Sequence, residues 1–151
     1  MFSLPQKLEE AAAALLTALA VTVNVTRAGV SSAVALTVLK GISEDDKAVP
    51  SITVAALSGQ ESPQFSGNFI LTFTADIKSN ADETTLADHR TLCDAALVPL
   101  MSDDTAAQLS AAASDFTVIG ITNRQSSERI EDRSWITSLT FDAYCAGVAL
   151  T

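Results

Sequence analysis

Residues 69–78 read FILTFTADIK and set the pattern for the fold. Every odd position from Phe69 to Ile77 is apolar, whereas the even positions from Thr72 to Lys78 are polar. Because successive side chains of a strand point to opposite faces, this alternation predicts a strand with one buried face and one mostly solvated face. Such a strand is typical of an antiparallel sheet that is covered on one side.

Three other segments favour strands around this one. Trp135–Cys145 alternates apolar and polar residues as regularly as the first segment, and Phe116–Asn123 precedes it as a further strand. A shorter strand places Ile52, Val54 and Ala56 on one face. The sequence therefore predicts one sheet built from widely separated parts of the chain.

The polar run Arg124–Arg133 separates the last two predicted strands and contains one apolar residue, Ile130. We expect a long, exposed hairpin tip, preceded by a β-bulge or a close backbone approach at Gly120. The run carries three Arg, two Glu and one Asp, and a loop of mixed charge can pair with a rotated copy of itself in a head-to-tail ring. A mobile solvent loop is the alternative. The candidate subunit interface comprises Arg124, Arg129, Glu131, Asp132 and Arg133.

Helical periodicity appears in two regions. Leu4–Ala20 has apolar residues at helical spacing, and a Ser-x-x-Gln capping box begins at Ser3. A second helix follows Thr85, its expected N-cap, and Pro99 should kink or end it. A shorter helix should run from about residue 104 to 113. Each helix has an apolar face that can pack on a sheet.

The segment Val21–Leu39 is apolar and rich in residues that favour strands. Val21–Val25 alternates like a strand, Gly29, Ser31 and Ser32 interrupt the pattern, and Leu36–Leu39 predicts a second short strand. Unpaired strand edges of this kind associate with partners. Because strands occur in runs rather than alternating with helices, we predict an α+β fold: a mostly antiparallel sheet with two main helices packed on one face, in a single domain covering residues 1–151.

Composition excludes several classes of function and structure. The 18 acidic and 9 basic side chains give a formal charge of −9, which opposes duplex wrapping and binding to anionic membranes. Ala11–Val25 is too short and too often interrupted by polar residues to span a bilayer. Two cysteines, Cys93 and Cys145, are too few for a disulfide framework, and we expect both to be buried.

The motifs of known enzymes are missing from the sequence. A single histidine, His89, excludes every multi-histidine metal site, and neither a nucleophile elbow nor a phosphate-binding loop occurs. We expect His89 at an exposed or boundary position of its helix, with Cys93 within reach at i, i+4. Acidic pairs in loops suit helix caps and solvated turns, and a small carboxylate- or metal-dependent hydrolase is the alternative. We therefore expect no enzyme, no catalytic residue, no bound metal and no cofactor.

The order of these elements resembles the tail-terminator, or minor tail completion, proteins of long-tailed bacteriophages. The resemblance covers most of the chain from Leu4 to Cys145. The features that carry it are the N-terminal helix Leu4–Ala20, the loop ending in Pro50 before the strand Ser51–Val54, the segment Ser66–Phe69 that opens a long strand, the segment Asn80–Asp82 before the helix bearing His89 and Arg90, and the closing strand that begins Arg133-Ser134-Trp135.

The resemblance implies a structural virion protein: a homo-oligomeric ring, typically a hexamer, that terminates the tail tube and contacts the head-completion proteins. Its implied location is the tail or neck of the virion, after assembly in the host cytoplasm. DNA would pass through the ring without specific binding, and an acidic lumen would repel its phosphates. The candidate lumen acids are Glu44, Asp45 and Asp46. A head-to-tail connector (neck) subunit is the alternative within this class.

Overall fold

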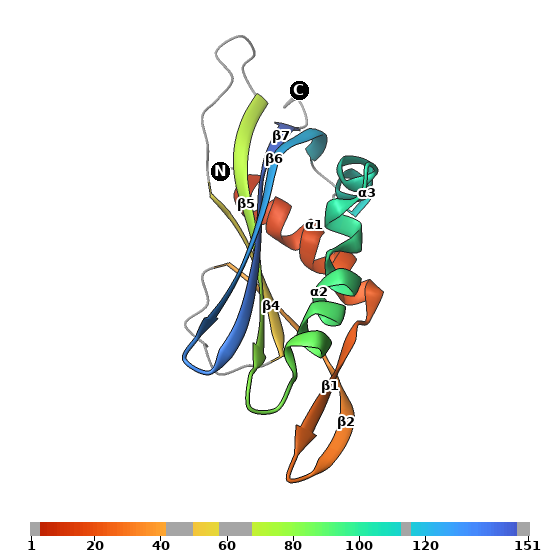
Figure 1. Cartoon of the computed structure of the whole chain (residues 1–151). Helices are drawn as coiled ribbons and strands as arrows, with labels where there is room; N and C mark the ends of the chain where they lie inside the picture. Colours follow the sequence, from red (N-terminus) through yellow and green to blue (C-terminus); the bar gives the residue numbers. More distant parts are fainter. Residues whose placement is uncertain (1–3, 42–49, 58–67, 113–115, 148–151) are drawn as a thin grey trace.

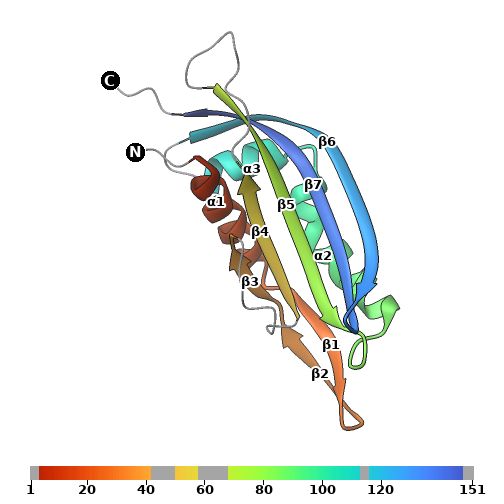
Figure 2. The same cartoon turned by 90° about the vertical axis from the view of Figure 1, so that its left-hand side faces the viewer.

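The computed structural model describes residues 4–41, 50–57, 68–112 and 116–147. Three helices lie on one face of a five-stranded sheet, and a two-stranded sheet extends from one end (Figure 1 and Figure 2). The elements in chain order are α1 Leu4–Leu19, β1 Thr22–Arg27, β2 Val30–Ala35, β3 Thr37–Lys40, β4 Ser51–Leu57, β5 Asn68–Asn80, α2 Leu86–Met101, α3 Thr105–Ala112, β6 Phe116–Glu131 and β7 Ser134–Gly147. The predicted α+β class is confirmed, with a mostly antiparallel sheet and its helices on one face.

The centre of the larger sheet is the antiparallel pair β5–β7, in the strand order β3-β4-β5-β7-β6. The alternating residues of β5 form the core as predicted, since Leu71, Phe73 and Ile77 are all buried. Phe73 lies directly opposite Phe141, and their rings stack with centroids 4.7 Å apart. Stacked aromatic pairs add stability beyond the area that they bury.

The helices cover this apolar face. In α1, Leu8, Ala12 and Leu16 recur at helical spacing and are buried, which confirms the predicted amphipathic helix. The N-cap of α2 is Thr85, as predicted, and its hydroxyl accepts a 3.1 Å hydrogen bond from the Asp88 amide. α2 ends at Met101, soon after Pro99. The expected capping box at Ser3 lies outside the described residues.

The interruption that we expected at Ser31 and Ser32 is wrong, because both residues belong to β2. The chain turns at Ala28 and Gly29, whose φ angles of 52° and 77° are both positive. A two-residue turn with two positive φ angles matches the twist of an antiparallel hairpin, so β1 and β2 pair from Arg27↔Val30 outward. The hairpin projects beyond the end of the larger sheet (Figure 2).

The exposed tip that we expected over residues 124–133 is also wrong, because β6 continues through it to Glu131. The turn consists of Asp132 and Arg133 alone, with φ angles of 48° and 60°. Pairing with β7 satisfies the backbone groups of every second residue in this polar run, which outweighs the low strand propensity of its side chains. The predicted irregularity at Gly120 is confirmed, and a second one follows where Asn123 has a φ of 58°.

Candidate subunit interface

On one side of the five-stranded sheet, the chain itself covers β4. β3 pairs with the first half of β4, and the Gly41 amide donates a 2.8 Å hydrogen bond to the Val54 carbonyl. Beyond the end of β3, the Glu9 carboxylate reaches from α1 and accepts a 2.8 Å hydrogen bond from the Ala56 amide. These contacts occupy the outward backbone groups of β4, and the edge strand on this side is β3, whose four residues leave little backbone for further pairing.

The opposite edge, formed by β6, is covered only over its first half. The Ser110 hydroxyl on α3 accepts a 2.8 Å hydrogen bond from the Val118 amide. Further along, the Arg124 guanidinium donates to the carbonyls of Leu100 and Ser102, at 3.2 and 2.8 Å. Arg124 was predicted as an interface residue, but its contacts are with the C-terminal end of α2, where a cation suits the free carbonyls.

The second half of β6, Gln125–Glu131, is exposed along its whole length. The two-residue turn makes Glu131 and Ser134 a hydrogen-bonded pair, and such pairs alternate along an antiparallel ladder. The backbone groups of three alternate residues therefore point outward from the sheet: Ser126, Glu128 and Ile130. Within the described ranges, no residue outside the ladder bonds to their amides or carbonyls. We call Gln125–Glu131 the β6 edge.

The hairpin has an equivalent open edge on β2. On the β1 side, the outward groups are used: the Thr26 amide donates to the Glu83 carbonyl at 2.8 Å, and the Thr84 hydroxyl donates to the Asn24 carbonyl at 3.3 Å. On the β2 side, the same alternation turns the backbones of Ser31, Ala33 and Ala35 outward. No hydrogen bond to these three backbones is found in the described part of the chain. We call Val30–Ala35 the β2 edge; it contains no charged residue.

The other predicted interface residues lie at the shared end of β6 and β7. Arg129 Nε is 3.1 Å from Glu131 Oε2, and Arg129 Nη1 donates to Ser138 Oγ at 3.0 Å. Arg133 Nη1 is 3.7 Å from Asp82 Oδ2. The structure therefore brings Arg129, Glu131, Asp132 and Arg133 together but pairs both arginines within the chain. The candidate lumen acids Glu44, Asp45 and Asp46 lie outside the described residues.

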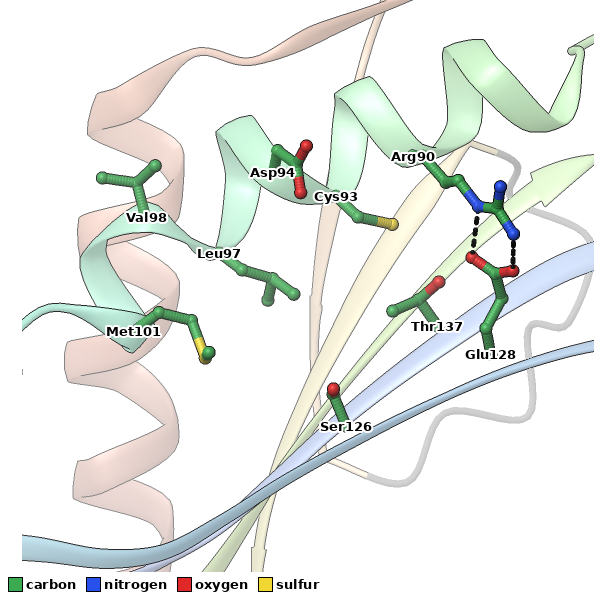
Figure 3. A pocket seen from close by; sticks show the side chains of 9 residues that line it. All are labelled: Arg90, Cys93, Asp94, Leu97, Val98, Met101, Ser126, Glu128 and Thr137. Carbon is green, nitrogen blue, oxygen red and sulfur yellow. Dashed lines mark hydrogen bonds and ion pairs between the residues drawn. The ribbon is translucent and has the colours of Figure 1, made fainter.

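A groove of about 490 Å³ runs between α2 and the β6 edge (Figure 3). At one end Arg90 and Glu128 form a two-pronged ion pair, with distances of 3.0 and 2.7 Å between their nitrogen and oxygen atoms. The hydrogen bonds to Glu128 raise the pKa of Arg90, and the same bonds lower the pKa of Glu128. Toward the other end, Val98 and Met101 are 61% and 51% exposed. The groove thus joins an ion pair to uncovered apolar surface beside an open strand.

His89 is fully buried, which corrects the exposed or boundary position that we expected. Its Nδ1 lies 2.6 Å from Ser79 Oγ, and its Nε2 lies 2.9 Å from Thr137 Oγ1. Burial lowers the pKa of His89, while the nearby Glu128 carboxylate raises it and Arg90 lowers it further. A neutral imidazole with two hydroxyl partners is tolerated in a core, so His89 ties α2 to β5 and β7.

Cys93 does contact His89, with Sγ 3.4 Å from Nε2. However, burial raises the pKa of Cys93 to about 11 and that of Cys145 to about 12. The thiolate is the reactive form of cysteine, and it is scarce at neutral pH for both residues. The pair is therefore a packed polar contact, and both cysteines are buried as predicted. Among the described residues, no group of three or more His, Cys, Asp or Glu side chains is placed to hold a metal ion.

Sequence reasoning missed the β6 edge and the Arg90–Glu128 pair, and it noticed the β2 edge only as an apolar segment. One usable signal was Ala28-Gly29 between two runs of strand-forming residues, which is a two-residue hairpin pattern. None of the helices in the described ranges is long and apolar enough to cross a membrane. A scan against protein-family models and a search of curated proteins both found no match for this chain.

Proposed function

We propose that this chain is a structural subunit of a homo-oligomeric ring that terminates the tail tube of a long-tailed bacteriophage. The observation that carries the proposal is the presence of two uncovered strand edges, the β2 edge and the β6 edge, on separate parts of one chain. An uncovered edge of a folded protein is a template for pairing with another chain. A chain with two such edges can bind one copy on each side.

Two different surfaces on one subunit favour a head-to-tail arrangement. When the same patch meets itself, a two-fold dimer results and assembly stops. When one patch meets a different patch, copies add in one direction until the rotation closes a ring. The ring is typically a hexamer in the family that the sequence resembles, and we propose the same closed form here.

The place of the ring in the virion is proposed from the order of elements and from charge. A subunit with a formal charge of −9 suits a channel through which DNA passes, because like charges prevent the phosphates from adhering to the wall. The proposed neighbours are the tail tube protein on one side and the head-completion proteins on the other. The loop that carries Glu44, Asp45 and Asp46 is the proposed source of lumen charge.

The purified chain should give a closed ring in negative-stain images. Co-expression with candidate neighbours then places the ring: a tail terminator should co-purify with the tube protein, whereas a neck connector should co-purify with the portal-side protein. Co-purification with the portal-side protein alone would favour the connector alternative. Images that show only single subunits at high protein concentration would contradict both assignments.

A further inference from the structure

We infer that the ring closes by strand addition: the β2 edge of one copy pairs with the β6 edge of the next copy. The inference rests on the proposed ring and names the surfaces that form it. The five-stranded sheet would then continue across the subunit boundary through the neighbour's β2 and β1. Each copy would offer one edge and receive one, so that neither edge stays open in the closed ring.

The backbones of the two edges match. Three alternate residues of β2 turn their amides and carbonyls outward, and three alternate residues of the β6 edge do the same. Because both sets repeat every second residue, each outward group can meet a partner in a regular ladder. The β6 edge receives the strand more readily than the first half of β6, where Ser110 already occupies the Val118 amide.

The side chains near the contact are also compatible. An added strand would place every second side chain beside the groove, where Val98 and Met101 are exposed. Both faces of β2 are uncharged, so neither direction of pairing brings a charge against this apolar surface. Val30, at the tip of the hairpin, is itself 67% exposed and gains cover in the contact.

Charge favours this pairing over two copies of the β6 edge meeting each other. The β6 edge holds one Arg and two Glu, and all three are already in ion pairs within the chain, Arg90–Glu128 and Arg129–Glu131. A neutral β2 leaves these pairs undisturbed. Two β6 edges would instead bring four Glu and only two Arg together on a chain that is already strongly acidic.

Proline substitutions test the inference because each removes an outward amide that no residue of the described ranges uses. The Ala33 amide points away from β1, and the Ser126 amide points away from β7, so Ala33→Pro and Ser126→Pro should leave both hairpins paired. Ala33→Val and Ser126→Ala keep the amides and serve as matched controls. Native mass spectrometry of the full chain reads the oligomeric state, and circular dichroism checks that each variant is folded.

We expect the unaltered chain and both controls to form the ring, and each proline variant alone to be monomeric. Mixed in equal amounts, the two proline variants should form a one-to-one dimer and nothing larger, because each supplies the edge that the other lacks. A folded Ala33→Pro variant that still forms the ring would overturn the inference while leaving the ring intact. An unaltered chain that stays monomeric would instead contradict the proposed function.

Hydrogen exchange on the unaltered chain keeps the inference testable if a proline variant does not fold. The amides of Ser31, Ala33, Ser126 and Glu128 should exchange at least tenfold more slowly in the concentrated, assembled protein than in dilute monomer. The Thr26 amide, which already donates to Glu83, is the internal control and should change little. Rapid exchange at all four positions in the assembled ring would overturn the inference.

Discussion

The β2 edge and the outer side of β4 differ in whether the chain covers their outward backbone groups. On β4, the strand β3 and the Glu9 carboxylate occupy the outward backbone groups, so that only the four residues of β3 form an edge on that side. On β2, an uncharged strand ends at an exposed Val30 with no such cover among the described residues. Natural sheets usually protect their edges against unwanted pairing. The difference supports the proposal that β2 pairs with another copy.

The strand β6 is intermediate between these two cases, because only half of it is covered. The first half of β6 is covered by Ser110 and by the Arg124 side chain, and its second half, the β6 edge, is open but carries charges. Those charges form ion pairs within the chain. The edge therefore remains open but favours a neutral strand over a charged one. A neutral strand can approach it, whereas a charged strand would have to compete with Arg90 or Arg129. The following predictions test this difference between covered and open strand edges, beginning with the largest expected effect on stability.

Replacing Arg124 should expose how the covered half of β6 is maintained. Arg124→Ala removes two charge-assisted hydrogen bonds to carbonyls at the end of α2, and we expect the free energy of unfolding to fall by about 2 to 3 kcal/mol. Arg129→Ala, which removes an exposed pair at the open half, should change it little. Urea denaturation measures both. Equal losses in the two variants would contradict the structural role assigned to Arg124.

Replacing Glu9 should uncover the end of β4. Glu9→Ala leaves the part-buried Ala56 amide without its acceptor, and we expect a loss of about 1 to 2 kcal/mol together with a new tendency to aggregate. The neighbouring substitution Glu10→Ala is the control and should have neither effect. Urea denaturation and light scattering measure the two outcomes. If Glu9→Ala behaved like Glu10→Ala, the protection of β4 would not depend on this carboxylate.

Acidification should weaken the core behind the β6 edge. Because burial lowers the pKa of His89 below the ordinary 6.5, the unfolded chain binds a proton that the folded chain excludes as the pH falls through 6.5. Stability from this residue is therefore complete above pH 6.5 and declines below it, by at most about 1.4 kcal/mol per pH unit. His89→Gln should lack this component. The melting temperature measured from pH 7.5 to 5.5 tests it, and parallel curves for both proteins would contradict it.

Placing a charge on the β2 edge should make the two open edges alike. Val30 is 67% exposed, so Val30→Lys should change the free energy of unfolding by less than about 0.5 kcal/mol. Assembly should nevertheless weaken, because the contact that covers Val30 would instead have to desolvate a lysine. Val30→Ile is the matched control. Oligomerisation of Val30→Lys at the same concentrations as the control would show that this edge is not part of the contact.

Local pattern predicted the central strands well and the peripheral ones poorly. The alternation in residues 69–78 was sufficient because its apolar side chains are the core. The polar residues 125–131 gave no such signal, since their strand is imposed by the backbone of β7. The burial of His89 depends on Ser79 and Thr137, which are distant in sequence, so no local pattern could have predicted it.

The sequence placed the candidate interface residues in one polar run, but it did not predict the contacts that they make. Four of these five residues do gather at one end of the molecule, but their charges are largely paired within the chain. The backbone edges that we propose as the contact depend on strand register, which sequence alone does not give. Arg124 was assigned to the interface because it belongs to the same polar run, whereas it lies within the register shift between Thr122 and Gln125 and its side chain contacts the end of α2.

A concentration series of the unaltered chain by native mass spectrometry tests most directly whether copies of the chain pair through their open strand edges to form a ring. Two unlike edges per chain predict a single closed species, whose mass is a whole multiple of the 15.7 kDa subunit, in equilibrium with monomer. A protein that remains at 15.7 kDa at the highest concentration, or that forms an open-ended ladder of masses, would contradict the closed ring.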